Sequence, residues 1–438
     1  MKHSMKWGAG LVAVASLALA GCASNGDSTT ATESTGTSSQ DPVTLSMAGW
    51  SLDSTPEFQT LADAFHAANP DITIEVNEYK SGDDYDTQMI ADLAAGSAPD
   101  LYVLKTLKNF FTYQDGGQLL DVSDVAANYD SSTNGLSTYA VDGKTFAVPY
   151  RQDSWYLYYD KDLFDQAGVG YPDGTWTWDD YAAAAGELKV GLDGDDVFGT
   201  YQHGWQSTVQ GLANAQSPGA DILSGDFGYM KPFYDRAVAL QDNGAQVDFN
   251  TLSTNQLSYQ SQFGTQKTAM LIMGSWYVGA YLTQVGTGDA LEFNWGIAPA
   301  PQLDASTTSN PVTFADPTAI GINPAIDDSK VDAAKKFLAF IGGEEAGVAL
   351  ANIGITSAYA SETVTAAYFA LDGVPNDDLS KFTFSTHETV PENPVSADTA
   401  AVQSILGDMH SAIMSEGTSV DDAIAEAEAR VKNEVLNQ

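Results

Sequence analysis

Strands and helices alternate at the start of this chain, and that alternation restricts the possible folds more than any other feature. Short apolar runs predict three strands, at 43–47, 72–76 and 100–103. The segments between them predict two helices, at 57–68 and 85–95. This order is typical of a parallel sheet covered by helices, so the sequence predicts an α/β protein. Ligands of such sheets bind beyond the carboxyl ends of the strands, where this chain places Trp50 and Lys105.

A second block of alternating elements follows a predicted hairpin at 141–144. Strands are predicted at 155–159, 268–273 and 319–322. Helices are predicted at 161–167, 177–189, 231–241, 257–264, 331–341 and 420–435. The chain has 438 residues, whereas a single core stops growing at about 250–300 residues, so two domains are expected.

The N-terminus has the pattern of an export signal. Lys2 and Lys6 precede an apolar stretch at 8–19 that is too short to cross a hydrocarbon core of about 30 Å. The stretch ends in Leu-Ala-Gly-Cys22, which resembles the lipobox of bacterial lipoproteins and holds the only cysteine of the chain. That resemblance implies a signal peptide at 1–21 and a lipid on the Cys22 thiol. A plain secretory signal with an incidental cysteine is the alternative.

The segment that starts at the cysteine, 22–41, consists mostly of Ser, Thr, Ala, Gly and Asn. It offers too little apolar surface to fold, and the sequence therefore predicts a flexible leash. A lipidated Cys22 on such a leash would tether the folded body to a membrane.

The chain is strongly acidic, with 58 Asp and Glu against 18 Lys and Arg and a net charge of −40. Phosphate backbones need a basic surface, so nucleic acid is not expected as a partner. The acids are spread along the sequence, which favours a solvated surface over a dedicated site for a cation. The histidines show no metal-ligand spacing, and no phosphate-binding loop, calcium loop or nucleophile elbow is present. No cofactor and no metal are predicted.

Several segments, in this order along the chain, resemble the carbohydrate-binding proteins of ABC importers, the maltose-binding-protein-like family 1 of extracellular solute-binding proteins. They are Ser97–Leu101, Phe146–Tyr150, Trp155–Phe164, Thr177–Asp180, Phe263–Trp276 and Lys335–Phe340. The resemblance implies a two-lobed periplasmic-binding-protein-like fold, with a ligand cleft and strands that cross between the lobes. The first lobe would take 42–150 plus 318–365, and the second 151–317 plus 366–438. Crossings are expected near 150–152 and 314–319.

The function that the resemblance implies is capture of an extracellular sugar, in the first place an oligosaccharide, in an aromatic-lined cleft between the lobes, and its delivery to the permease of an ABC transporter. The resemblance implies a monomeric, non-enzymatic protein, held by its lipid at the outer face of the bacterial cytoplasmic membrane. Two alternatives stay open. One is a secreted glycoside hydrolase with a pair of carboxylates, and the other is a binding protein of the same fold for a cationic small molecule.

Sugar rings have apolar faces and a rim of hydroxyls, so we expect flat aromatic side chains and hydrogen-bonding side chains at the site. The predicted ligand-binding residues are Trp50, Lys105, Arg151, Asp153, Trp155, Trp205, Trp276 and Asp316. Of these, Asp153 and Trp276 match family positions that bind sugar. Trp178 and Trp295 are predicted to be core residues instead.

Overall fold

The first sheet is built from the predicted strand–helix alternation. The computed structural model describes residues 42–53, 55–80, 83–194 and 196–437. The alternating elements are β1 (Val43–Trp50), α1 (Glu57–Ala68), β2 (Ile72–Tyr79), α2 (Asp83–Ala95) and β3 (Leu101–Leu104). Strand β1 pairs in parallel with both β2 and β3, as the βαβ pattern predicts.

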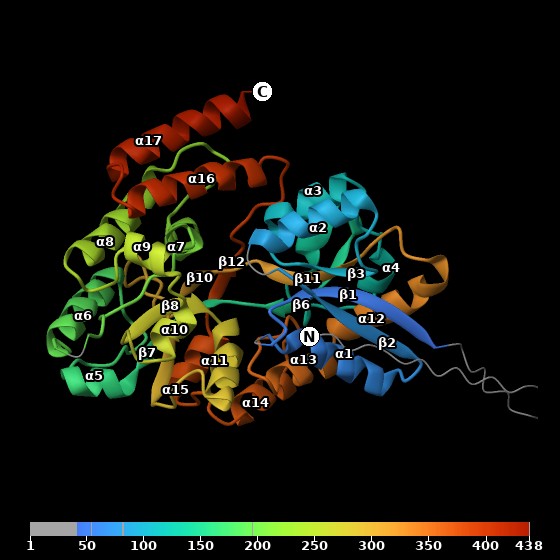
Figure 1. The fold of residues 1–438 in the computed structure, drawn as a ribbon, viewed down its shortest axis with the longest axis horizontal. Helices are drawn as coiled ribbons and strands as arrows, with labels where there is room; N and C mark the ends of the chain where they lie inside the picture. The colour runs from blue at the N-terminus through green and yellow to red at the C-terminus, as the bar shows by residue number, and fades with distance from the viewer. Residues whose placement is uncertain (1–41, 54, 81–82, 195, 438) are drawn as a thin grey trace, which may run out of the picture. The chain divides into compact units, whose positions relative to one another are not determined.

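Two later strands complete this sheet, whose order is β2-β1-β3-β11-β6 (Figure 1). Strand β11 (Pro317–Ile322) runs antiparallel to β3 on one side and to β6 (Ala147–Gln152) on the other. The central strand β3 is buried along its length, and α1 and α12 (Val331–Ile341) pack against the sheet.

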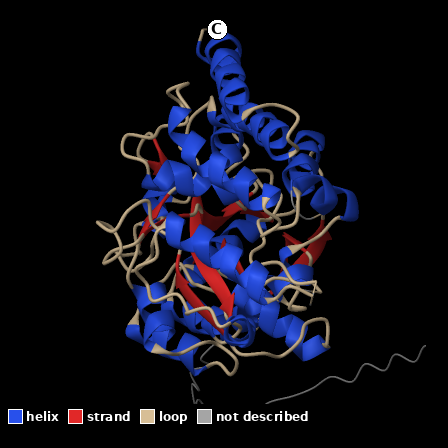
Figure 2. Ribbon diagram, turned by 90° about the vertical axis from the view of Figure 1, so that its left-hand side faces the viewer, coloured by secondary structure: helices blue, strands red, loops and turns tan. Residues whose placement is uncertain are grey.

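The second sheet has the order β8-β7-β9 and is antiparallel throughout. Its middle strand, β7 (Trp155–Asp160), is buried at every residue. Figure 2 shows helices and loops around the strands of the molecule. The neighbours are β8 (Met270–Gly274) and β9 (Trp295–Pro299). In this sheet Tyr158 stacks on Trp295 with 6.0 Å between ring centroids, so Trp295 is a core residue, as predicted.

The remaining elements between β3 and β10 are η1 (Leu107–Asn109), α3 (Phe110–Asp115), α4 (Ser123–Ala126), η2 (Leu136–Tyr139), β4 (Ala140–Val141), β5 (Lys144–Thr145), α5 (Lys161–Ala167), α6 (Trp178–Gly191), α7 (Ser207–Gln216), η3 (Gly228–Met230), α8 (Lys231–Asp242), α9 (Phe249–Asn255), α10 (Tyr259–Phe263) and α11 (Trp276–Thr287). From β10 on they are β10 (Val312–Phe314), η4 (Asp328–Lys330), α13 (Glu344–Ala351), α14 (Glu362–Ala370), α15 (Asp378–Ser385), β12 (Glu388–Val390), α16 (Thr399–Met414), α17 (Val420–Arg430) and η5 (Val431–Leu436).

Local sequence signals explain where several helices begin and end. Helix α6 starts at a capping box, in which Thr177 and Asp180 each bond the backbone N–H of the other. Asp160 caps α5 through the N–H of Leu163, and Gly168 ends that helix in a left-handed conformation. At the C-terminus the predicted α-helix to Val435 is wrong in part, because its last turn, η5, is a π-helix.

The described part of the chain has two hydrophobic cores. The first surrounds the five-stranded sheet and includes Leu45, Phe58, Val103 and Phe337. The second surrounds the three-stranded sheet and includes Tyr158, Leu188, Ile297 and Leu406. Within the ranges described, no helix combines the length and the apolar character that crossing a bilayer requires.

The chain passes between the two cores at neighbouring places. It runs from β6 to β7 after Gln152 and from β10 to β11 before Pro317, and these two residues are paired in the first sheet. Both passages coincide with the crossings expected from the sequence. A third passage follows α13, because Ile355 packs in the first core and Val364 in the second. The lobe boundaries at 150 and 365 stay predictions, and the signal peptide, Cys22 and the leash lie outside the described residues.

Candidate ligand-binding site

A buried group of charges lies at the first passage between the sheets. The Arg151 guanidinium bridges two carboxylates, with Nη1 2.5 Å from Oε1 of Glu57 and Nε 2.8 Å from Oδ2 of Asp153. Only 8% of the arginine side chain is exposed, and still less of either acid. Tyr150 donates a hydrogen bond to Glu57 at 2.8 Å, and Ser275 donates one to Asp153 at 2.8 Å. We call Glu57, Arg151 and Asp153 the charged triad.

The charged triad connects the two cores. Glu57 begins α1 in the first, whereas Ser275 precedes α11 in the second. Burial raises the pKa of Glu57 and of Asp153, and the Arg151 charge opposes that rise in both. Burial also disfavours the charged arginine, but the two carboxylates outweigh it and raise the pKa of Arg151. One guanidinium beside two carboxyls leaves the triad with no net positive charge.

Four rings form an aromatic wall on the second core, namely His203, Trp205, Tyr259 and Trp276. The ring centroids of Trp205 and Trp276 are 6.5 Å apart, and His203 meets Trp205 edge-on at 4.4 Å. Trp205 is 41% exposed, an unusual exposure for tryptophan. Such partly exposed rings offer flat apolar faces to a ligand.

The position of the Trp276 ring depends on the glycine two residues before it. A Cβ at Gly274 would lie 1.9 Å from the Trp276 ring, so any other residue there would displace the indole. The Trp276 side chain also meets Trp155 edge-on at 5.5 Å. Trp155 itself is 3% exposed and stacks on Phe314 at 4.8 Å, which gives it a packing role.

The aromatic wall and the charged triad adjoin each other. The backbone N–H of Trp276 bonds the Asp153 carboxylate, and this bond lowers the pKa of that acid. Burial raises the pKa of the Tyr259 phenol, and the charges of Arg151 and Glu57 shift it further, downward and upward respectively. Five of the predicted residues are thereby brought together at or next to this place: Arg151, Asp153, Trp155, Trp205 and Trp276.

Trp50 and Lys105 lie together on the first core. The Lys105 ammonium is 5.5 Å from the Trp50 ring centroid, within cation–π range. The Trp50 ring is buried edge-on against Phe58 at 4.8 Å and Tyr85 at 5.0 Å. These contacts give Trp50 a packing role, and its ligand contact stays a prediction.

Asp316 has its hydrogen-bonding capacity filled by the protein. Its carboxylate accepts the N–H of Leu107 at 2.9 Å, of Glu392 at 2.9 Å and of Asn393 at 3.1 Å, and the Asn393 side-chain amide at 2.6 Å. Burial raises its pKa, against the effect of these donors. Asp316 therefore fastens three segments together beside the second passage, and contact of this residue with a ligand stays a prediction.

Four residues at this place were missed from the sequence: Glu57, Tyr150, His203 and Tyr259. Glu57 had a usable signal, because it opens the helix that follows the first strand, and Tyr150 directly precedes Arg151. His203 and Tyr259 carry no such signal. Over the described ranges, no three His, Cys, Asp or Glu side chains gather in a way that could hold a metal ion.

Known structures share this architecture. A sugar transporter from Rhizobium etli, solved in an open conformation, gives a TM-score of 0.75 at 30% identity, over 89% of this chain and 99% of that one. An ABC substrate-binding protein from Listeria monocytogenes, in complex with cycloalternan, gives a TM-score of 0.74 at 21% identity, over 91% of this chain and 100% of that one.

Curated relatives match over shorter stretches. A putative binding protein of Brucella abortus is 30% identical over 227 residues, which are 50% of each chain. The sn-glycerol-3-phosphate-binding periplasmic protein of Escherichia coli is 28% identical over 169 residues, 35% of this chain and 36% of that protein. The chain thus spans half or less of the length of these relatives.

Together the fold and its neighbours define a two-lobed solute-binding protein. The profile of one family, described as bacterial extracellular solute-binding protein, matches residues 49–348. The chain belongs to that family, which is extracytoplasmic and consists of binding proteins. The resemblance and the α/β two-lobed fold expected from the sequence are confirmed.

Proposed function

We propose that the protein captures a neutral sugar, an oligosaccharide in the first place, at the aromatic wall beside the charged triad. The observation that carries this proposal is the contact between the two, through Trp276 and Asp153. Aromatic rings suit the apolar faces of a sugar, and carboxylates accept hydrogen bonds from its hydroxyls. The bound sugar would then pass to the permease of an ABC importer.

The charge of the triad supports a neutral ligand over a phosphorylated one. Glu57 and Asp153 compensate Arg151 fully, so that no cationic side chain of the triad is left to bind phosphate. A phosphate group brought beside two buried carboxyls would be repelled. This chain would therefore differ in ligand from its glycerol-3-phosphate-binding relative.

A panel of ligands tests this proposal by thermal unfolding and calorimetry. We expect at least one neutral oligosaccharide to stabilise the protein, by about 2.7 kcal/mol at a hundredfold excess over its Kd. sn-Glycerol 3-phosphate should give no shift. Stabilisation by the phosphate ester, with none by any neutral sugar, would refute a neutral ligand.

A cation is the second candidate, because the triad carries no net positive charge and the whole chain is acidic. A polyamine such as spermidine belongs in the same panel. Binding of spermidine that survives 150 mM salt, where exposed charges are screened beyond about 8 Å, would favour this alternative. Product analysis of the oligosaccharide incubations would reveal hydrolysis if the protein were a glycoside hydrolase.

We also propose that a lipid on Cys22 anchors the protein to the outer face of the cytoplasmic membrane, with 22–41 as the leash. The Cys22→Ser variant should leave the membrane fraction or keep its signal peptide, and still bind ligand. Stable anchoring needs more than one acyl chain, so a protein that lacks the lipid should not remain bound to the membrane. A cleaved Cys22→Ser protein that stays in the membrane fraction would contradict the anchor.

A further inference from the structure

The hydrogen-bonding role of the His203 imidazole is set by the residues behind it. Its Nδ1 atom lies 2.9 Å from the phenol oxygen of Tyr201. The same phenol oxygen lies 2.9 Å from the backbone carbonyl oxygen of Leu257. In a neutral imidazole one nitrogen carries the proton and donates, whereas the other accepts. Which nitrogen of His203 is the donor therefore depends on the Tyr201 phenol.

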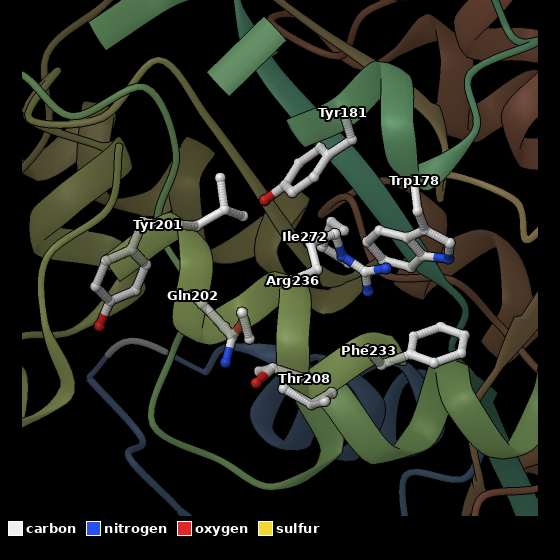
Figure 3. A pocket seen from close by; sticks show the side chains of 11 residues that line it. Trp178, Tyr181, Tyr201, Gln202, Thr208, Phe233, Arg236 and Ile272 are labelled. Atoms are coloured by element: carbon white, nitrogen blue, oxygen red, sulfur yellow. The ribbon is translucent and has the colours of Figure 1, made fainter. Parts of the chain in front are cut away.

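The Tyr201 phenol has one proton to donate, and its contact with Leu257 uses that proton. A carbonyl oxygen can only accept, so the phenol proton lies between these two residues. Burial raises the pKa of the Tyr201 phenol, which therefore keeps its proton at neutral pH. Figure 3 shows the Tyr201 hydroxyl on the side of its ring turned away from Arg236 and Trp178. The phenol oxygen can then only accept from Nδ1 of His203, so Nδ1 carries the imidazole proton.

The second nitrogen of His203, Nε2, is left as an acceptor. No residue in the described ranges makes a hydrogen bond to Nε2. It is not among the fully buried polar atoms that lack a partner, so it is open to solvent. Burial of most of the ring lowers the pKa of His203 to about 4, and Nε2 therefore has a free lone pair at neutral pH.

The ring that carries Nε2 is held firmly within the aromatic wall. It meets Trp205 edge-on at 4.4 Å and Tyr259 at 5.3 Å. The Thr208 hydroxyl fixes the backbone of this segment, because it lies 3.1 Å from the carbonyl oxygen of His203 and 2.7 Å from that of Trp205. An acceptor fixed in this way loses little conformational entropy when it binds a ligand.

We propose that Nε2 of His203 accepts a hydrogen bond from a hydroxyl group of the bound sugar, and that it selects ligands with a donor at this place. The inference rests on the proposed function, since it takes the aromatic wall to be the binding surface. A site that offers an acceptor discriminates against ligands without the matching donor, because the acceptor then loses water and gains no partner. A methyl ether, a carboxylate or a phosphate dianion offers only acceptors to Nε2.

The position of the imidazole proton can be measured in the free protein, by two-dimensional ¹H–¹⁵N correlation of the histidine ring nitrogens. The His203 resonances are those missing from the spectrum of the His203→Asn variant. We expect a proton on Nδ1 and none on Nε2 at neutral pH. A proton on Nε2 instead would overturn the inference, whatever the ligand is.

Calorimetric titration with maltotriose, cellotriose and xylotriose as probes tests the contact itself. His203→Asn keeps an amide N–H near the place of Nδ1 and has no atom at the place of Nε2, so it should weaken binding about tenfold. In His203→Gln the amide oxygen reaches the place of Nε2 and should restore most of the affinity. His66→Asn removes an exposed imidazole on α1 and should leave the affinity unchanged. Thermal melts check that each variant is folded.

The Nε2 resonance of the unaltered protein should shift when a probe binds. Suppose that a probe binds the unaltered protein and His203→Asn equally well and leaves this resonance in place. His203 is then no ligand contact, and the inference fails while the proposed function stands. If the unaltered protein binds none of the three probes, the proposed function and the inference fail together.

Discussion

Trp276 combines the features of a ligand-stacking residue more fully than any other tryptophan of the described chain. It begins α11, contacts Trp155 and Trp205, and keeps part of its ring exposed. Its backbone N–H meanwhile holds the carboxylate of Asp153. One residue therefore takes part in both halves of the candidate site.

We expect Trp276→Ala to weaken sugar binding by about 30-fold or more, because a central aromatic contact typically contributes 2 kcal/mol or more. Trp295→Ala is the control, since that ring is buried in β9. It should cost about 3–5 kcal/mol of unfolding free energy through cavity formation, with binding unchanged in the folded fraction. Calorimetric titrations and thermal melts on both variants distinguish the roles. Normal binding by an early-melting Trp276→Ala would make Trp276 a core residue.

At the residue scale, sequence motifs predicted the neighbourhood of the site better than its chemistry. Arg151, Asp153 and Trp276 lie in recognisable segments, and the fold brings them together. Tyr259 could not be predicted, and the sequence signal of Glu57, its place at the start of a helix, did not show its contact with Arg151, because both approaches depend on packing between distant elements. The hydrogen bonds that the protein donates to the Asp316 carboxylate could not be predicted either, since their donors come from segments far away in the sequence.

At the element scale, the junction around Asp316 joins η1, the start of β11 and the segment after β12. Glu392 belongs to this junction, and burial together with the neighbouring Asp316 charge raises its pKa from 4.5 to about 7. A carboxyl whose pKa is raised in the folded state binds its proton more tightly there than in the unfolded chain. The stability it contributes is present below pH 4.5 and is lost as the pH rises towards 7.

Glu392→Gln should therefore be more stable than the unaltered protein at pH 8, and the difference should disappear near pH 4. Glutamine mimics the protonated acid and can keep the hydrogen bond to Ser207. Urea unfolding at several pH values gives the difference directly. Glu388→Gln, at an exposed position of β12, removes the same charge as a control. A constant difference across this pH range would show that Glu392 does not titrate as described.

Whole elements were predicted well where a local signal marks both ends. The predicted helices 161–167 and 331–341 coincide with α5 and α12. Helices α7, α11 and α16 were not predicted individually. Their own apolar and small residues lie on most faces of each helix and blur the helical period. The insertion of β11 between β3 and β6 was also beyond prediction, since no local pattern encodes a pairing between distant strands.

At the scale of the whole molecule, the two cores are joined by adjacent passages and by the charged triad. A ligand that touches both cores would favour the state in which they approach, because a ligand shifts an equilibrium only by its differential affinity. A few residues at the passages would suffice as hinges. Gly135 is packed closely against the end of the second passage, since a Cβ on it would lie 2.7 Å from Pro317.

Ligand binding should therefore reduce the radius of gyration measured by small-angle scattering. The ligand is the sugar identified by the panel, at saturation, and the Trp276→Ala variant at the same concentration serves as the control. That variant should show a smaller change, in proportion to its lower occupancy. An unchanged radius at full occupancy would exclude closure as the response to ligand.

The position of β11 also sets an order of assembly during synthesis. Strands β7, β8 and β9 of the second sheet are all made by Pro299, whereas β11 begins only at Pro317. Until then β3 and β6 both present unpaired backbone edges, which attract strands of other chains. A polypeptide interrupted between these two points would carry one finished sheet and one sheet open in its interior. Of these two sheets, the one that is started first is therefore the one that is completed last.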